Sequence, residues 1–363
     1  MELTDDLTAM RFALDWAAKG MFITAPNPRV GCVIVKDGKL IGVGHTQPAG
    51  QAHAEVQALR DAVERGHDVR EATVYVTLEP CSHYGRTPPC ADALVRAGVA
   101  RVVVAAGDPN PLVGGQGIAK LRTAGIAITV GVCEEDAREL NIGFMKRMRQ
   151  GTPWVRMKAA ASLDGKTALH NGRSQWITSQ AAREDGHWWR ARACAVLTGI
   201  GTVKDDNPQL NVRAVETPRQ PQRIVIDSRL ETDPRARVLD GGGTWIVAAQ
   251  PNPEKQRQLE DAGAEVILLP NAHGKVDLPA LMLELGKRQI NEVHVEAGFK
   301  LNGSLIREGC VDELLLYLAP SLLGDAQGLF DLPALASLDG ARHLAFHSVE
   351  RIGPDLRILA RFN

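Results

Sequence analysis

Apolar and polar residues alternate over the first 150 positions in a pattern that predicts a domain of mixed helices and strands. Apolar residues recur at helical spacing over residues 7–17 and 53–65. Two apolar runs, 31–35 and 40–44, flank Asp37-Gly38 and predict a β-hairpin, because Asp-Gly favours the tight turns that join such strands. The later elements expected here are strand 73–77, helix 90–97, strand 101–105, helix 118–124 and strand 126–130. This order predicts an α/β sandwich with one hairpin and at least two crossover units.

The second part of the chain predicts another α/β domain. Residues 145–153 are basic and rich in turn formers, so we place the domain boundary there and expect domains over residues 1–147 and 148–363. Strand-like runs with helical patterns between several of them predict a mainly parallel sheet. The expected strands are 154–159, 195–199, 223–227, 244–248, 266–269, 292–296 and 313–318.

Composition narrows the class of protein. A chain of 363 residues with 44% hydrophobic content can bury two cores. The 42 basic and 43 acidic residues leave no positive excess for general phosphate-backbone binding, which favours a small-molecule substrate over nucleic acid. No apolar run approaches the length of a membrane span, and no basic segment precedes an apolar stretch at the N-terminus, so we expect a soluble, cytoplasmic protein with no membrane partner. Six scattered cysteines favour reduced thiols over a disulfide scaffold.

One histidine and two cysteines in the first domain form a candidate zinc site. His53 opens a predicted helix, Cys81 follows the predicted strand 73–77, and Cys90 lies nine positions later. One imidazole and two thiolates suit Zn²⁺ and leave a fourth position for water, which is typical of a catalytic site. Zinc lowers the pKa of bound water to about 7, and Glu55, two residues from His53, is placed to move protons beside the metal.

The order of these residues resembles the zinc nucleobase deaminase signature, in which His-x-Glu is followed by Pro-Cys and a second cysteine. Eight residues separate the two cysteines here, whereas deaminases of cytidine or tRNA have two. The intervening residues 82–89 and the upstream residues 26–32 resemble the deaminase of the riboflavin pathway. That resemblance implies a cytidine-deaminase-like α/β/α sandwich, with Asn27 a substrate contact and Arg86 a contact to the substrate phosphate. The chain departs from the family at His45-Thr46, where Tyr-His is expected, which puts a histidine contact to the substrate in doubt.

Four strings in the second domain carry a further resemblance. The domain lacks a Gly-x-Gly-x-x-Gly loop after a strand, which disfavours a conventional dinucleotide fold. The strings 161–166, 174–177, 202–213 and 295–298 together resemble the riboflavin-specific reductase, whose fold is like that of dihydrofolate reductase. The resemblance implies a dihydrofolate-reductase-like α/β domain that uses NADPH.

The same resemblance assigns ligand contacts in the second domain. Residues 298–304 form a strand end that opens a helix, where backbone N–H groups favour phosphates. The implied cofactor contacts are Ala160, Trp176, Thr202, Asp206, Ser228, Gly298, Phe299, Lys300, Leu301, Asn302, Gly303 and Ser304. The implied substrate contacts are Ser174, Arg190, Leu210, Arg213 and Glu296, of which the two arginines suit the ribose phosphate because guanidinium pairs bidentately with it. Asp206, Glu296 and Lys158 stay open as the proton donor.

We therefore expect a bifunctional enzyme that uses Zn²⁺ and NADPH. The first domain would deaminate 2,5-diamino-6-(5-phosphoribosylamino)pyrimidin-4-one and the second would reduce its ribosyl side chain to ribityl. The expected partners are this phosphorylated pyrimidine and further copies of the chain, as a homo-oligomer. Two alternatives stay open: a tRNA or nucleoside deaminase fused to an unrelated domain, and a non-catalytic zinc-binding ligand sensor. The eight-residue interval and the near-neutral charge count against the first alternative.

Overall fold

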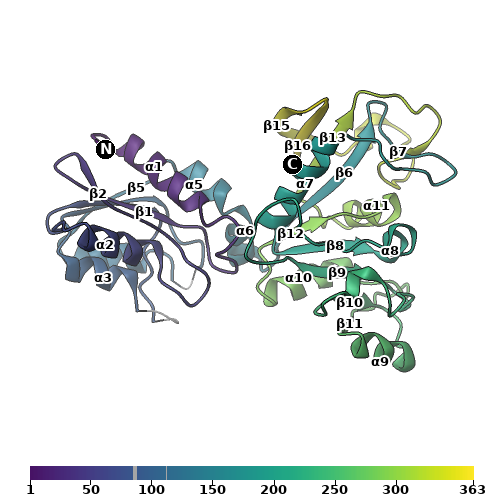
Figure 1. Ribbon diagram of the computed structural model, residues 1–363, viewed down its shortest axis with the longest axis horizontal. Coiled ribbons are helices and arrows are strands. Elements are labelled where there is room, and N and C mark those ends of the chain that lie inside the picture. The colour runs from purple at the N-terminus through teal and green to yellow at the C-terminus, as the bar shows by residue number, and fades with distance from the viewer. Residues whose placement is uncertain (85–87, 112) are drawn as a thin grey trace. The chain divides into compact units, whose positions relative to one another are not determined.

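The computed structural model describes residues 1–84, 88–111 and 113–363, which divide into two units, Met1–Gly151 and Thr152–Asn363 (Figure 1). Each unit has its own β-sheet and its own buried apolar core. No helix within the described residues combines the length and the apolar character that crossing a bilayer requires.

A five-stranded sheet of order β2-β1-β3-β4-β5 organises the first unit. Its strands are β1 (Gly31–Lys36), β2 (Lys39–His45), β3 (Thr73–Leu78), β4 (Arg101–Ala106) and β5 (Ala127–Val130). Strand β1 pairs antiparallel with β2 and β3, and β3, β4 and β5 are parallel. The expected hairpin is therefore present, and the order of strands is that of the expected sandwich.

Helices cover both faces of this sheet. Helices α1 and α5 pack on one face, and α2 and α3 pack on the other (Figure 1). Because both faces are covered, the central strands are apolar throughout, as Val102, Val103 and Val104 of β4 show by having no exposed surface. The helices are α1 (Asp6–Ala18), α2 (Ala54–Glu64), α3 (Cys90–Ala97), α4 (Gln116–Thr123), α5 (Glu134–Leu140) and α6 (Ile142–Gln150).

Helices α5 and α6 were not expected from the sequence. Residues 145–150, interpreted as turn-rich, belong to α6. Met145 is buried in the core of the first unit, and Arg147 and Arg149 lie in the last turn of the helix, where cations stabilise the carbonyl end. The helix ends at Gly151, whose φ of 74° is one that glycine adopts readily.

The second unit contains a nine-stranded sheet of order β11-β10-β9-β8-β12-β6-β13-β16-β15. The seven strands from β11 to β13 are parallel, as expected, and β13, β16 and β15 pair antiparallel. The strands are β6 (Trp154–Ser162), β8 (Ala195–Gly199), β9 (Gln222–Ile226), β10 (Trp245–Ala248), β11 (Glu265–Leu268), β12 (Glu292–Val295), β13 (Glu313–Ala319), β15 (Leu344–Ile352) and β16 (Asp355–Phe362). Short strands β7 (Lys166–Ala168) and β14 (Gln327–Gly328) form a separate pair. The helices are α7 (Gln180–Arg192), α8 (Ile200–Asp206), α9 (Pro253–Asp261), α10 (Leu278–Lys287) and α11 (Phe299–Arg307), with short 3₁₀ turns at Arg237–Leu239 and Leu338–Gly340.

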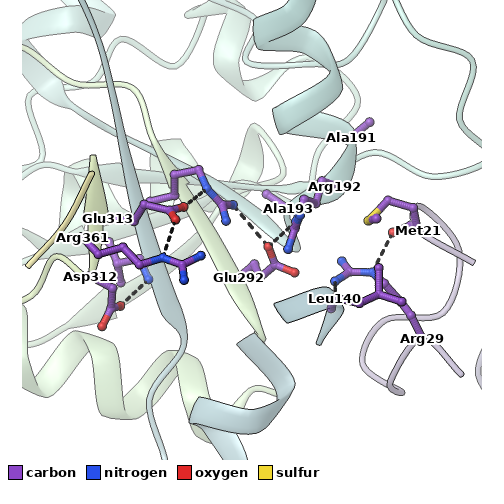
Figure 2. Close-up of polar contacts among 12 residues, drawn as sticks. Met21, Arg29, Leu140, Ala191, Arg192, Ala193, Glu292, Asp312, Glu313 and Arg361 are labelled. Carbon is purple, nitrogen blue, oxygen red and sulfur yellow. Dashed lines mark hydrogen bonds and ion pairs between the residues drawn. The ribbon is translucent and has the colours of Figure 1, made fainter. Parts of the chain in front are cut away.

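A buried network of charges holds the amino ends of the central strands together (Figure 2). The Arg156 guanidinium donates to Glu313 at 2.5 Å and to Glu292 at 3.2 Å, and these carboxylates are the first residues of β13 and β12. Arg192 donates to Glu292 at 2.8 Å and Arg361 to Glu313 at 2.9 Å. Removing one member would leave a buried charge with one partner fewer, which is costly in a low-dielectric interior, so the network stabilises the pairing of these strands. Thr202, Ser228 and Glu296, which are expected ligand contacts of the second unit, lie at the opposite, carboxyl side of this sheet.

Candidate functional site

Three side chains converge in the first unit as a candidate metal centre. His53 is the N-cap residue of α2, Cys81 follows β3, and Cys90 is the first residue of α3. His53 Nδ1 lies 3.6 Å from Cys81 Sγ and 3.4 Å from Cys90 Sγ, and the three ligand atoms all lie within 4.8 Å of one another. One nitrogen and two sulfurs at this spacing fit a zinc ion and leave a fourth position open.

Electrostatics favour a thiolate at this centre. Hydrogen bonds from Cys90 and His53 lower the pKa of Cys81 to about 4, although burial opposes the shift. The backbone N–H of Cys90, at the start of α3, also donates to Cys81 Sγ at 3.3 Å. The pKa values of Cys90 and His53 are raised, chiefly because each donates to Cys81. Because the thiolate is the form that binds metal, Cys81 is prepared for a cation at neutral pH.

Glu55 lies in the first turn of α2, beside the candidate metal centre. Its side chain is almost fully buried, with 3% of its surface exposed. Burial raises the pKa of Glu55 to about 7, and the negative charge of Cys81 adds to the shift. A carboxyl group with a pKa near the working pH both accepts and donates a proton, which is the property that a general acid–base catalyst needs.

Glu79, to which the sequence analysis gave no role, positions the segment that carries Cys81. Its buried carboxylate accepts four backbone N–H groups at 2.9–3.2 Å. The donors belong to the segment that leads into α4 and to the first turn of that helix: Asp108, Gly115, Gly117 and Ile118. An acidic residue directly after a buried strand and before Pro-Cys was the available signal in the sequence.

Two glycines allow helices to approach the site closely. A Cβ atom at Gly44 of β2 would lie 2.4 Å from the carbonyl oxygen of Ala54, at the start of α2. A Cβ atom at Gly117 of α4 would lie 1.9 Å from the carbonyl oxygen of Pro80. Both distances are shorter than atoms tolerate, so glycine is required where α2 presents His53 and where α4 abuts the residue before Cys81.

The loop that carries Asn27 is held by a buried arginine. Arg29 Nε donates to the carbonyl of Met21 at 3.2 Å and Nη1 donates to the carbonyl of Leu140 at 2.9 Å (Figure 2). The backbone of Arg29 also exchanges two hydrogen bonds with the Asn141 side chain, at 2.7 and 2.9 Å. These contacts order the loop of Asn27 without using the Asn27 side chain.

Thr46 replaces the expected histidine and is buried. Its hydroxyl lies 3.5 Å from the carbonyl oxygen of Val30, while the ring of His45 contacts the Thr46 carbonyl at 3.1 Å and lies beside Trp16. The His45 ring is thus engaged with its own turn. Arg86, the expected phosphate contact, lies outside the described residues.

In the second unit, many of the expected ligand contacts gather at the carboxyl ends of adjacent strands. Thr202 follows β8, Ser228 follows β9, Glu296 follows β12, and Ala160 lies near the end of β6. The sheet order β9-β8-β12-β6 makes these strands neighbours, and carboxyl ends of parallel strands form the usual ligand crevice of open α/β sheets. A Cβ atom placed on Gly298 would lie 3.9 Å from Thr202 Oγ1, so the segments after β8 and β12 lie side by side.

The start of α11 fits an anionic cofactor group. Gly298 is its N-cap residue and supplies no side-chain cap, so the first backbone N–H groups of the helix are open to a phosphate. Gly303 packs so tightly on Asp331 that a Cβ atom would lie 2.2 Å from the Asp331 carbonyl oxygen, and Leu301 packs against Gly199. Asn302 is buried, and its Oδ1 has no partner among the described residues. Phe299, Lys300 and Ser304 complete the expected cofactor segment on the same helix.

An ion pair links α7 to the end of β12. Arg190 Nη2 donates to Glu296 Oε2 at 2.7 Å, and Arg190 Nη1 donates to the carbonyl of Asn211 at 3.0 Å. Burial alone would raise the pKa of Glu296, but Arg190 lowers it well below its usual value. Burial lowers the pKa of Lys158, with the charge of Arg190 adding to the shift and that of Glu296 opposing it. Arg190, Glu296 and Lys158 therefore share one electrostatic environment.

The remaining expected contacts lie on two loops. Trp176 is 70% exposed and Arg183 stacks over its ring at 4.4 Å, while the neighbouring Gln175 donates to Asp206 at 3.1 Å. These contacts place the segment of Ser174 beside the end of α8. On the other loop Leu210 is buried, and the exposed Arg213 donates to the Asn211 side chain at 3.1 Å.

Two family models match the chain. The RibD C-terminal domain matches residues 153–358, and the cytidine and deoxycytidylate deaminase zinc-binding region matches residues 3–106. The chain is 48% identical to the riboflavin biosynthesis protein RibD of Escherichia coli, with 96% of each chain covered. It is 46% identical to RibD of Haemophilus influenzae, with 98% of this chain and 97% of the relative covered.

Solved structures give the same result over both units. RibD of Acinetobacter baumannii, in its form 1, matches with a TM-score of 0.90 at 42% identity, and 99% of each chain is covered. A diaminohydroxyphosphoribosylaminopyrimidine deaminase/5-amino-6-(5-phosphoribosylamino)uracil reductase of Thermotoga maritima matches with a TM-score of 0.86 at 32% identity over 98% of each chain. The expected fold of both domains is therefore confirmed.

Proposed function

The chain belongs to the RibD family of riboflavin biosynthesis proteins, and on this basis we propose which residues carry out each of its two reactions. It is a bifunctional enzyme of riboflavin biosynthesis, a zinc-dependent deaminase and an NADPH-dependent reductase. The match of residues 153–358 to the RibD C-terminal domain excludes an unrelated second domain. The observation that carries the assignment of residues is the convergence of His53, Cys81 and Cys90 beside the buried Glu55.

In the deaminase reaction, His53, Cys81 and Cys90 would hold the zinc ion. When bound, zinc makes water a competent nucleophile at neutral pH by lowering its pKa toward about 7. Glu55 would transfer the first proton of the attacking water to a pyrimidine ring nitrogen and the second, from the hydroxyl group so formed, to the amine that leaves as ammonia. Its burial and its pKa of about 7 support this role, because the group changes protonation state without a large cost in either direction. Asn27 contacts the substrate from the loop that Arg29 orders.

In the reductase reaction, NADPH supplies the hydride, and the protein supplies placement and charge. The open N–H groups at the start of α11 bind a cofactor phosphate, with Thr202 and Ser228 on the neighbouring strand ends. Arg190 and Arg213 bind the ribose phosphate of the substrate. Glu296 is kept ionised by Arg190 and is therefore a poor proton donor. Lys158, whose pKa burial lowers, is the better donor of the three candidates.

Glu55→Gln tests the deaminase assignment. The variant keeps the shape of the side chain but removes its proton transfer, so ammonia release should fall by about 10²- to 10⁴-fold. Bound zinc, measured on the purified protein, and NADPH oxidation with the deaminated substrate should be unchanged. The exposed Glu64 on the same helix offers a matched control, Glu64→Gln, which should retain both activities. Ammonia release by Glu55→Gln at the native rate would contradict the shuttle role.

Location and self-association are further parts of the proposal. Six free cysteines support a reducing compartment, the cytoplasm. Strand β15 ends the nine-stranded sheet with an exposed edge and an exposed Phe346, which supports contact between copies of the chain. Light scattering of the purified protein measures the second property directly, and a monomer at micromolar concentration would contradict it.

A further inference from the structure

His187 lies on the same face of α7 as Arg190, because residues three positions apart on a helix are neighbours. Its ring is buried, with 9% of the residue exposed, and Nδ1 accepts the backbone N–H of Arg213 at 3.4 Å. Arg190 donates to the carbonyl of Asn211 at 3.0 Å. Helix α7 therefore forms two hydrogen bonds with the backbone of the segment 211–213.

The segment 207–213 needs such support. Asn207 and Leu210 have φ values of 42° and 52°, in the left-handed region that non-glycine residues rarely adopt. The Gln220 side chain also holds the backbone of Val212: its Oε1 accepts the Val212 N–H at 2.7 Å and its Nε2 donates to the Val212 carbonyl at 3.0 Å. A backbone of this kind persists only where its surroundings determine it, and His187 is one of the side chains that do so.

Two guanidinium groups meet at Asn211. Arg190 donates to its carbonyl, and Arg213 donates to its Oδ1 at 3.1 Å. Burial lowers the pKa of His187 to about 4, and the charges of Arg190 and Arg213 add to the shift. The ring is thus neutral at physiological pH. Because Nδ1 accepts a hydrogen bond, the proton of the neutral ring resides on Nε2.

We infer that His187 is a positioning residue of the substrate phosphate site: its Nδ1 holds the main chain of Arg213 so that Arg213 and Arg190 meet one phosphate. A neutral ring suits this place, because a third positive charge near the guanidinium groups of Arg190 and Arg213 would be repelled by both. This inference rests on the proposed function, in which Arg190 and Arg213 bind the substrate phosphate.

The test compares three variants of the full-length, zinc-loaded enzyme. His187→Leu removes both ring nitrogens, His187→Asn keeps an acceptor near the position of Nδ1, and Arg213→Ala removes the guanidinium. Reductase KM and kcat are measured with the deaminated substrate and with its dephosphorylated form. His187→Leu should raise KM for the phosphorylated substrate roughly fivefold to tenfold, with kcat within about twofold and no change for the dephosphorylated form. His187→Asn should restore most of the loss. Ammonia release and the Kd of NADPH, which report folding of each unit, should stay at native values.

Other results would contradict either the role of His187 or the proposed phosphate site. Equal KM changes for the two substrates, or His187→Asn as defective as His187→Leu, would show that His187 does not act through Arg213 on the phosphate. A native KM in His187→Leu together with a raised KM in Arg213→Ala would overturn the role of His187 and leave the proposed phosphate site intact. If Arg213→Ala also failed to distinguish the two substrates, the proposed phosphate site itself would be wrong. If His187→Leu failed to fold, His187→Ala, which also lacks both ring nitrogens, would replace it, and a native KM for the phosphorylated substrate in that variant would overturn the inference.

Discussion

Glu79→Gln should uncouple the zinc site from the sheet that supports it. The native carboxylate uses Oε1 for the N–H groups of Gly117 and Ile118 and Oε2 for those of Asp108 and Gly115. Glutamine has nearly the same size, so packing is preserved. Its amide, however, has one acceptor oxygen, and its NH₂ group would face two N–H donors.

The magnitude follows from this count. Two of the four hydrogen bonds to a charged acceptor are lost, and each contributes about 1.5–3 kcal/mol. The free energy of unfolding of the first unit should therefore fall by about 3–6 kcal/mol. A typical domain has a net stability of about 5–15 kcal/mol, so the first unit should be strongly destabilised. Because Glu79 directly precedes Pro80-Cys81, the loss should be expressed first at the metal centre.

The assay follows the two units with separate probes, because a two-domain chain need not unfold in one step. Zinc release into a chromogenic chelator during urea titration reports the first unit, and NADPH oxidation with the deaminated substrate reports the second. Glu79→Gln should release zinc at a clearly lower urea concentration than the native enzyme while the reductase midpoint is unchanged. Glu64→Gln, at an exposed position, is the control and should match the native protein. A zinc-release midpoint for Glu79→Gln that equals this control would contradict the supporting role of the Glu79 carboxylate.

Further predictions concern single groups. Glu55 has a pKa of about 7 in the folded protein against an ordinary value of 4.5, so its burial destabilises the folded protein increasingly from pH 4.5 to 7 and by a constant amount above pH 7. Glu55→Gln should therefore stabilise the zinc-free protein by about 3 kcal/mol at pH 8 and not at pH 4, as measured by urea unfolding. Gly117→Ala should destabilise the first unit by about 1–3 kcal/mol because its Cβ meets Pro80, whereas Gly186→Ala, where the space is open, should not destabilise the second. Arg213→Ala should raise the reductase KM roughly 10- to 100-fold for the phosphorylated substrate alone, and equal effects on both forms would contradict a phosphate contact.

The sequence predicted the candidate metal centre well because its signal is local and chemical. His53 begins a helix, Cys81 follows a buried strand, and Cys90 begins another helix, so the secondary structure that the pattern predicts already places each side chain at an element end. Strand boundaries in the parallel sheet were also close to those observed, since strands covered on both faces are continuous apolar runs.

Features that depend on distant backbone groups could not be predicted in this way. Glu79 is recognised only through N–H groups 29 to 39 residues away, and a sequence shows side-chain types, not where a backbone points. The contact made by His187 forms only because the loop 207–213 contains two residues in the left-handed region. Neither is a glycine, so the amino-acid sequence does not indicate that conformation. Strands β15 and β16 were missed because β15 is exposed along most of its length and has no regular alternation of apolar residues. Helix α6 was missed because its apolar face is narrow and its last turns are basic.

In both units, the N-terminus of a helix is placed to stabilise a negative charge. In the first unit, the start of α3 directs the Cys90 N–H at the Cys81 sulfur, so a helix N-terminus stabilises the negative charge that will bind metal. In the second unit, the open start of α11 provides N–H groups for a cofactor phosphate. The carboxylates then have opposite tasks. Burial and the charge of Cys81 raise the pKa of Glu55, which suits proton transfer, whereas Glu296 is paired with Arg190 and stays ionised. The difference between a proton carrier and a fixed charge thus follows from whether a guanidinium lies beside the buried acid.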